Sequence, residues 1–313
     1  MPSMRPIAAI DIGSNTVHLL VGTGSPGEAV EHLVSETELL ELGRELERHG
    51  RIRDKKARQL ERILRGHLEA ARKAGAKEVL IAATRAMRAA SNGGKVIQRL
   101  ERALGAPVRL LSEAAEARLA FLGAAPDLDR RDPQVLIDSG GASTEVTLTS
   151  GRRRRAAISM PIGSSLLCAQ LRGDPPGPLE WAQLCLGLAD ALKTLPTAPR
   201  PVAAIALGGS AHRIEELHGG DSGAPVTLPD LERIARRLLR HRARHIARAT
   251  GIEKGKVTLL AAGTLIIHAV LSHYGLDAVR VGHHGLRDGM ITAFQRAGGN
   301  WWRYRRSTAT PRR

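Results

Sequence analysis

Two short segments of the sequence place an aspartate immediately before a glycine-containing turn, where a phosphate could bind. Residues 11–16 read DIGSNT, and residues 138–145 read DSGGASTE. Each aspartate ends an apolar run that predicts a buried strand, and the small residues after it offer backbone amides and hydroxyl groups to an anion. Taken singly, each segment fits a plain hairpin turn equally well.

The two segments occupy equivalent places in a pattern that occurs twice. Closely spaced strands joined by glycine turns are expected over residues 7–35 and again over residues 135–159, with Asp11 and Asp138 separated by 127 positions. Two such loops that face each other would clamp a phosphate chain and a divalent metal ion between them. The duplication therefore predicts two similar domains with the site between them.

Regular elements behind the loops must hold them in place. A stripe of apolar residues with a 3.6-residue period predicts a long helix over residues 54–74, and strands then alternate with helices. A polar, proline-bounded stretch over residues 126–133 is the expected boundary, and the alternation continues beyond it. The prediction is an α/β fold with domains at residues 1–126 and 127–298 and a basic tail at residues 299–313.

Composition and charge restrict the classes of molecule that the protein is expected to bind. The 313 residues are 42% hydrophobic, enough to bury two cores, and 47 Lys and Arg against 31 Asp and Glu give a formal charge of +16. This excess favours a polyanionic partner, whereas seven aromatic residues are too few for stacking along a single strand, so a nucleic acid is not expected. The charge gathers in residues 152–155, 228–256 and 301–313, which predicts a steering surface separate from the loops.

Cysteine use and apolar runs indicate the compartment. Cys168 and Cys185 lack any spacing for metal or redox chemistry, which is typical of a reducing environment. The apolar runs fall short of the roughly 20 residues that span a bilayer. A cytoplasmic protein without a membrane partner is therefore expected.

Seven blocks of the sequence resemble, in order, the exopolyphosphatase and guanosine pentaphosphate phosphohydrolase family (Ppx/GppA). The blocks are residues 8–21 (AAIDIGSNTVHLLV), 82–89 (AATRAMRA), 111–123 (LSEAAEARLAFLG), 135–146 (VLIDSGGASTEV), 159–163 (SMPIG), 206–210 (ALGGS) and 279–290 (VRVGHHGLRDGM). The resemblance implies two actin-like, ribonuclease H-like domains of the sugar kinase, chaperone ATPase and actin superfamily, with the site in the interdomain cleft. It implies release of terminal phosphate from inorganic polyphosphate, with the guanosine polyphosphate pppGpp as second substrate and Mg2+ or another divalent cation as cofactor.

The same resemblance assigns roles to single residues. Glu116 matches the catalytic glutamate, the base that deprotonates the attacking water, and Asp138 matches a metal-binding aspartate. The turn that meets a nucleoside in relatives is matched by Gly208, Gly209 and Ser210. The residues that match phosphate contacts are Asp11, Gly13, Ser14, Asn15, Arg88, Gly140, Gly141, Ser143, Glu145 and Arg287.

The chain also departs from the family pattern. Glu113 stands where glycine is usual, and Ala115 replaces the first of two adjacent glutamates, which either leaves Glu116 as the sole base or alters the metal site. Two alternatives stay open: a non-catalytic or altered-specificity binder of polyphosphate or nucleotide, and a small-molecule kinase of the same superfamily. Some members carry an extra C-terminal helical domain; this sequence resembles the short form, and family precedent implies a homodimer.

A pair of adjacent histidines, His283 and His284, precedes the last expected helix. Adjacent side chains point to opposite sides of an extended segment, and no further ligand stands near them at metal-binding spacing. A polar turn is expected here rather than a metal site.

Overall fold

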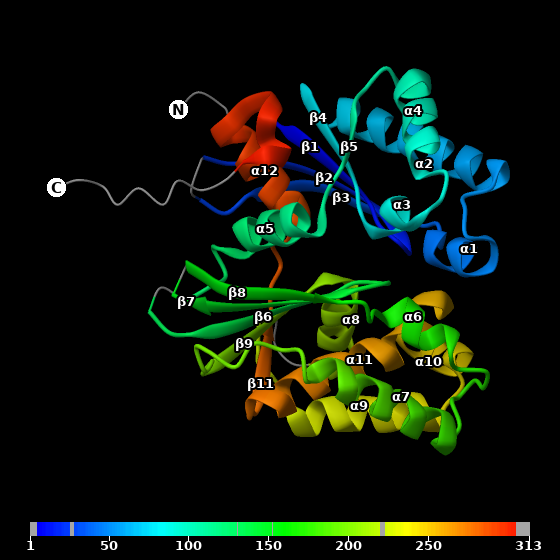
Figure 1. Cartoon of the computed structure of the whole chain (residues 1–313), viewed down its shortest axis with the longest axis vertical. Coiled ribbons are helices and arrows are strands. Elements are labelled where there is room, and N and C mark those ends of the chain that lie inside the picture. Colours follow the sequence, from blue (N-terminus) through cyan, green and yellow to red (C-terminus); the bar gives the residue numbers. More distant parts are fainter. Residues whose placement is uncertain (1–4, 26–27, 130, 152, 220–222, 305–313) are drawn as a thin grey trace.

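The structure, a computed structural model, describes residues 5–25, 28–129, 131–151, 153–219 and 223–304. These residues form two lobes stacked along the longest axis, each built on one β-sheet (Figure 1). Arg152 and residues 305–313, which carry part of the expected basic segments, lie outside the described residues.

The first lobe is built on a five-stranded mixed sheet. Its strands are β1 (Ile7–Ile12), β2 (Thr16–Thr23), β3 (Glu31–Leu39), β4 (Glu78–Ala83) and β5 (Val108–Leu110), and its helices are α1 (Leu42–His49), α2 (Asp54–Lys73), α3 (Arg85–Ala89), α4 (Gly93–Leu104) and α5 (Glu113–Ala124). The strand order is β3-β2-β1-β4-β5, with an antiparallel meander followed by two strands parallel to β1. Along β1, Ile10 and Ile12 face the cluster that contains α2 to α4, while Ala9 faces the opposite cluster. Both faces of β1 are therefore buried, which explains its unbroken apolar run.

The second lobe repeats this plan with additional helices. Its strands are β6 (Gln134–Ser139), β7 (Thr144–Ser150), β8 (Arg153–Met160), β9 (Ala203–Leu207), β10 (Val226–Thr227) and β11 (Ala278–Val281), and its helices are α6 (Ser164–Ala169), α7 (Pro178–Leu192), α8 (Gly208–His218), α9 (Leu228–Arg240), α10 (Ala243–Thr250) and α11 (Lys254–Tyr274). The strand order is β10-β11-β9-β6-β7-β8. The strands β8-β7-β6-β9-β11 match β3-β2-β1-β4-β5 in order and in direction.

The duplication extends to details of the backbone. The register of the second and third strands shifts between Val21 and Gly22 in the first sheet and between Leu148 and Thr149 in the second. These positions are 127 residues apart, the same offset as Asp11 and Asp138. The two meanders thus share an irregularity at equivalent positions. The internal repeat predicted from the sequence is confirmed.

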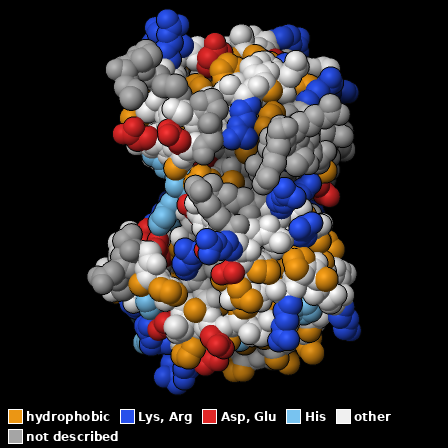
Figure 2. All heavy atoms as spheres, turned by 90° about the vertical axis from the view of Figure 1, so that its left-hand side faces the viewer, with side chains coloured by type: hydrophobic (Ala, Val, Ile, Leu, Met, Phe, Trp, Pro, Cys, Tyr) orange, Lys and Arg blue, Asp and Glu red, His pale blue; other side chains and the backbone are white. Residues whose placement is uncertain are grey.

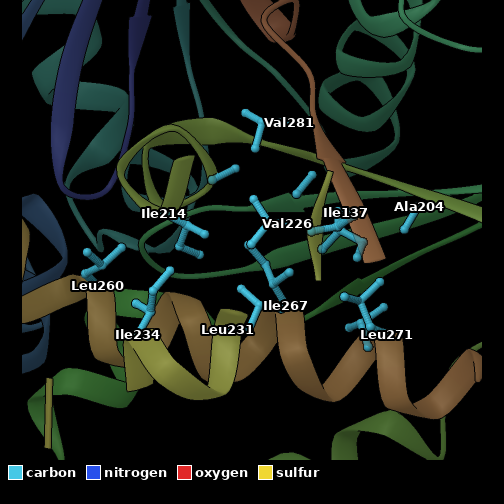
Figure 3. Close-up of a cluster of buried hydrophobic side chains, with 14 of the residues drawn as sticks. Ile137, Ala204, Ile214, Val226, Leu231, Ile234, Leu260, Ile267, Leu271 and Val281 are labelled. Atoms are coloured by element: carbon cyan, nitrogen blue, oxygen red, sulfur yellow. The ribbon is translucent and has the colours of Figure 1, made fainter. Parts of the chain in front are cut away.

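The core of the second lobe lies between its sheet and helices α9 and α11. Ile137 and Ala204 from the sheet meet Leu231 and Ile234 from α9 and Ile267 from α11 in this layer (Figure 3). Within the described residues, α11 is long and apolar enough to cross a membrane by length and composition, but most of its apolar window is buried inside the protein. An apolar helix of this kind is typical of the centre of a packed domain.

The last two elements contact the first lobe, although the sequence pattern assigns residues up to 298 to the second domain and residues from 299 to a basic tail. Helix α12 (Leu286–Ala297) and the 3-10 helix η1 (Gly298–Arg303) follow β11. Met290 and Ile291 of α12 and Trp301 of η1 share one buried cluster with Ala9 and Leu20 of the first sheet, and Trp301 is only 4% exposed. These side chains cover the face of the first sheet that α2 to α4 leave open. The sequence did not predict this contact because the periodicity of a helix does not reveal which sheet the helix covers.

Helix α5 lies between the two sheets (Figure 1). Leu119 belongs to the cluster on the first sheet, whereas Ala124, with Phe121 packed alongside, belongs to a cluster with Leu136 and Ile205 of the second. The helix therefore contacts both lobes. Its first turn, which carries Glu116, is held where the two lobes meet.

Candidate active site

The two glycine-containing loops meet between the lobes. The first joins β1 to β2 and the second joins β6 to β7, and each is closed by an equivalent backbone hydrogen bond, Gly13 N to Thr16 O (3.0 Å) and Gly140 N to Ser143 O (2.9 Å). A Cβ atom on Gly141 would lie 3.2 Å from the Cβ of Asn15. The absence of a side chain at Gly141 therefore lets one loop approach the other closely.

A helix braces each loop from behind. In the first lobe, the amide of Gly43 in α1 donates to the carbonyl of Ser14 (2.7 Å). In the second lobe, the amides of Ser164 and Ser165 in α6 donate to the carbonyls of Gly140 (2.9 Å) and Gly141 (2.7 Å). Both helices follow the third strand of their meander, so the repeat supplies the same support on the two sides of the site.

Four carboxyl groups lie close enough to affect one another. Burial raises the pKa of Asp11 to about 6, with Arg287 opposing the shift. Burial, together with the charges of Glu145 and Asp11, raises the pKa of Asp138 to about 7. Asp138 and Glu145 are direct cross-strand partners, and burial also raises the pKa of Glu145. Glu145 accepts a hydrogen bond of 2.7 Å from Ser159 Oγ, which partly offsets its burial.

Glu116 reaches this cluster from the first turn of α5. Burial, and then the charge of Glu145, raise its pKa to about 8. The opposing influence is Arg88, whose Nη1 donates to Glu116 Oε2 at 2.7 Å and to the Leu111 carbonyl at 2.7 Å. The Nη2 atom of Arg88 is buried and has no hydrogen-bond partner among the described residues. A donor is therefore available for an anionic oxygen beside Glu116.

Arg287 supplies positive charge to the same cluster. It lies in the first turn of α12, and burial lowers its pKa while the charges of Asp11, Asp288 and Asp138 raise it. Its Nη1 makes a long contact of 3.5 Å with the Leu19 carbonyl. The charges of the aspartates in both loops thus act on the guanidinium.

The carboxyl cluster fits a divalent cation. Asp11 Oδ1 is buried and has no hydrogen-bond partner among the described residues, although a buried carboxylate oxygen normally has one. Mg2+ prefers oxygen ligands, and carboxylates at this depth need a positive partner to stay ionised. Asp11, Asp138 and Glu145 offer such oxygens from strands of both lobes.

The two halves of the site differ at the residue that pairs with the loop aspartate across the strands. Asp11 pairs across the strands with His18, as Asp138 pairs with Glu145. The His18 ring contacts the hydroxyl groups of Thr16 (2.6 Å) and Thr37 (3.0 Å), and burial lowers its pKa well below the usual value. The first meander thus places a neutral imidazole where the second places a carboxyl group.

Two residues that depart from the family pattern lie in different surroundings. Ala115 is buried in the apolar cluster of the first lobe with Leu111 and Leu119. Glu113 is exposed, and its Oε1 lies 3.8 Å from Arg88 Nη2. The replacement at Ala115 therefore leaves Glu116 and the loop carboxyl groups in place, and Glu113 adds a negative charge beside Arg88.

The segment Gly208, Gly209 and Ser210, which the resemblance places near a nucleoside, lies at the start of a helix. It forms the first turn of α8, directly after β9. Gly208 has φ of +88°, and a Cβ atom there would lie 3.2 Å from Asp138 Oδ1. Because Gly208 has no side chain, the helix can begin beside Asp138. The glycines in the sequence indicate a turn but do not reveal whether a loop or a helix follows it.

Two serines of the site were not predicted. The Oγ atoms of Ser139 and Ser165 are buried and have no hydrogen-bond partner among the described residues. Ser139 lies between Asp138 and Gly140, and a Cβ atom on Gly141 would lie 2.9 Å from Ser165 Oγ. Their position beside the glycines of the second loop was the signal in the sequence. A serine hydroxyl group can donate a hydrogen bond to a phosphate oxygen.

Comparisons with known proteins agree with this geometry. The family model described as the Ppx/GppA phosphatase family matches residues 22–295. Exopolyphosphatase 1 of Mycobacterium leprae is 26% identical over 298 residues, which cover 91% of this chain and 88% of that protein.

Solved structures share the fold at lower sequence identity. An exopolyphosphatase from Cytophaga hutchinsonii superposes with a TM-score of 0.84 at 20% identity, covering 93% of this chain and 98% of that one. A Ppx/GppA family member from Aquifex aeolicus gives a TM-score of 0.78 at 23% identity, covering 93% and 97%. The predicted pair of actin-like domains is confirmed.

Proposed function

The chain belongs to the Ppx/GppA phosphatase family, and on this basis we propose that it hydrolyses the terminal phosphate of inorganic polyphosphate, with pppGpp as a second substrate. The single observation that carries the proposal is the position of Glu116. It is a partly buried carboxyl group near the two loops, and it is held by Arg88, whose buried Nη2 has no hydrogen-bond partner among the described residues. The exopolyphosphatase named among the relatives supports the choice of substrate.

The residues of the chain divide the reaction between them. Glu116 accepts a proton from the attacking water as the water oxygen bonds to the terminal phosphorus. The bridging P–O bond breaks, which releases inorganic phosphate and a polyphosphate chain that is one unit shorter. Arg88 holds Glu116 through Nη1 and offers Nη2 to a phosphate oxygen. The Ser139 and Ser165 hydroxyl groups and the Arg287 guanidinium bind the remaining phosphate charge.

A divalent cation such as Mg2+, held by Asp11, Asp138 and Glu145, would supply the positive charge that keeps these carboxyl groups ionised and neutralises phosphate oxygens. The pKa of Glu116 near 8 reflects burial and the neighbouring charge of Glu145 in the protein alone. Neutralising Glu145 removes one of these causes and favours the ionised form that a base requires.

The basic surface on α9 is suited to capturing a long polyanion, but it takes no part in the hydrolysis itself. Arg233, Arg236, Arg237 and Arg240 line one open hollow along α9. Figure 1 shows α9 on the side of the second lobe that faces away from the first. These four arginines, part of the predicted basic segment over residues 228–256, therefore lie on an outer face, apart from the carboxyl cluster.

The proposal is tested by phosphate release from long polyphosphate, short polyphosphate and pppGpp with Mg2+. Glu116→Gln is expected to reduce release by about 10²- to 10⁴-fold while polyphosphate binding persists. Glu69→Gln, an exposed α2 position, serves as the matched control and keeps full release. Chelation should stop release, and added Mg2+ should restore it in the wild type but not in Asp138→Asn.

The alternatives give different results in the same experiment. Tight, salt-sensitive polyphosphate binding without any phosphate release would identify a binding protein. Phosphorylation of an acceptor from ATP without free phosphate would identify a kinase. Equal release by Glu116→Gln and the wild type would remove Glu116 from the mechanism.

A further inference from the structure

Three potential metal ligands from separate segments meet at one edge of the domain junction. They are His32 of β3, His284 in the segment before α12, and Asp288 in the first turn of α12. Each offers one ligand atom, and these atoms all lie within 4.8 Å of one another. His32 Nε2 is 2.6 Å from Asp288 Oδ1, and the two imidazole rings meet edge to face with centroids 5.4 Å apart.

Neighbouring groups orient two of the three ligands. Asp127 Oδ1 lies 2.8 Å from His284 Nδ1, and Asp127 Oδ2 accepts a hydrogen bond of 3.2 Å from the His284 amide. Asp288 Oδ2 accepts a hydrogen bond of 2.7 Å from the Gly285 amide, which leaves Oδ1 toward His32. A carboxylate bonded to one nitrogen of a histidine is the usual support for a metal ligand at the other nitrogen.

The donor atoms indicate the class of metal. Two imidazole nitrogens and one carboxylate oxygen are a set typical of Zn2+ and similar divalent transition metals, with ligand distances of about 2.0–2.2 Å. The carboxyl cluster between the loops, by contrast, offers only oxygen and suits Mg2+. The two groups of ligands are therefore chemically distinct.

The degree of exposure suits entry of an ion. The side chain of His32 is 35% exposed, whereas that of Asp288 is only 5% exposed. A metal ion could reach the ligands through His32 while Asp288 anchors it, and the exposed side leaves a coordination position for water. Histidine side chains are visible at the edge of the waist between the two lobes in Figure 2.

We propose that His32, His284 and Asp288 bind one divalent transition-metal ion of the Zn2+ type, with Asp127 orienting His284. Asp127 lies in the connection from α5 to β6, and His284 in the connection from β11 to α12, so both chain crossings between the lobes contribute. His32 adds a strand of the first lobe. The bound ion would thus fasten both crossings to the first sheet.

The direct test is metal binding by the purified full chain after chelator treatment and dialysis. Zn2+ is titrated by calorimetry and Co2+ by its visible absorption, both in excess Mg2+ so that the oxygen-only cluster is occupied. The wild type is expected to bind one Zn2+ per chain. His32→Ala and His284→Ala are each expected to weaken binding by at least about tenfold.

His283→Ala is the matched control because its neighbour is a proposed ligand while His283 itself contacts Glu215 and His212 outside the group. It should bind Zn2+ as the wild type does. Saturating Zn2+ should raise the melting temperature of the wild type and of His283→Ala, but not of the other two variants. His32→Gln provides a second variant that keeps a polar side chain on this edge strand.

Two results would overturn the proposal. One is a wild-type chain that binds no Zn2+ at micromolar concentrations. The other is equal Zn2+ affinity in the wild type, His32→Ala and His284→Ala, which would place the ion elsewhere. Neither readout involves phosphate release, so the outcome does not depend on the proposed hydrolase activity.

Discussion

Arg88 binds Glu116 through a 2.7 Å hydrogen bond from Nη1 to Oε2, and the same nitrogen binds the carbonyl of Leu111. One guanidinium group thus connects α3, the start of α5 and the carboxyl group proposed as the base. Its second terminal nitrogen remains buried without a hydrogen-bond partner among the described residues. Arg88 can therefore position Glu116 and bind a phosphate oxygen at the same time.

Replacing Arg88 by lysine tests whether one guanidinium group both positions Glu116 and binds a phosphate oxygen. A lysine ammonium lacks the planar fork that spans Glu116 and a phosphate oxygen together. We expect Arg88→Lys to lower kcat/KM for polyphosphate by about 10²-fold, the usual effect of losing one charged donor in an active site. Arg99→Lys, on the surface of the first lobe, is the control and should stay within about twofold. Wild-type kinetics in Arg88→Lys would contradict the assigned role.

Glu113 lies 3.8 Å from Arg88 and brings negative charge beside the guanidinium proposed to bind a phosphate oxygen. Because this side chain is exposed, the repulsion it causes is modest and screened by salt. We expect Glu113→Gln to lower KM for polyphosphate by roughly two- to fivefold at low ionic strength, and the gain to shrink as salt is added. Glu69→Gln is again the matched control. An unchanged KM at low salt would show that Glu113 does not face the substrate.

Helices α5 and α12 touch through glycine. A Cβ atom on Gly123 would overlap the carbonyl oxygen of Gly285 and lie 2.7 Å from the Gly289 amide nitrogen, so the obstruction is backbone. We expect Gly123→Ala to lower the free energy of unfolding by about 2 kcal/mol or more, measured by chemical denaturation. Activity should fall as well, because α5 carries Glu116 and α12 carries Arg287.

The control for this variant is Gly66→Ala in α2, where a Cβ atom meets nothing within 4 Å. Alanine favours a helix more than glycine does, so this change should raise the free energy of unfolding by about 0.5–1 kcal/mol. If Gly123→Ala and Gly66→Ala changed the free energy of unfolding by similar amounts, the contact between α5 and α12 would be looser than described.

An ion pair between the buried Glu45 and the exposed Arg53 makes the stability of the first lobe depend on pH. Glu45 accepts hydrogen bonds from Arg53 Nε (2.7 Å) and Nη2 (3.1 Å), and these contacts lower the pKa of Glu45 to about 2. A carboxyl group whose pKa is depressed by folding stabilises the protein above its unfolded pKa near 4.5, and this contribution is lost as the pH falls toward 2.

Glu45→Gln should therefore lower the free energy of unfolding by about 1–2 kcal/mol at pH 7. The difference between variant and wild type should narrow as the pH falls from about 4.5 toward 2, as followed by denaturant titrations at several pH values. A difference that stays constant down to pH 2 would mean that the ionised carboxylate is not what stabilises the pair.

Local sequence patterns predicted much of this molecule. The loops at Asp11 and Asp138, their 127-residue spacing and the helix over residues 54–74 follow from strand periodicity, glycine turns and a helical apolar stripe. Each of these signals depends on neighbouring residues, so the sequence alone carries them. The match of ordered blocks then indicated the family and the roles of Glu116 and Arg88.

Tertiary structure alone decided which distant segments meet. It returns α12 and Trp301 to the first sheet, buries Ala115 in the core, and brings His32 to His284 across more than 250 residues of chain. No period or motif encodes these contacts, because they depend on which apolar faces remain uncovered after the two sheets have formed. The sequence therefore determined the parts and the chemistry of the site, and long-range packing determined their arrangement.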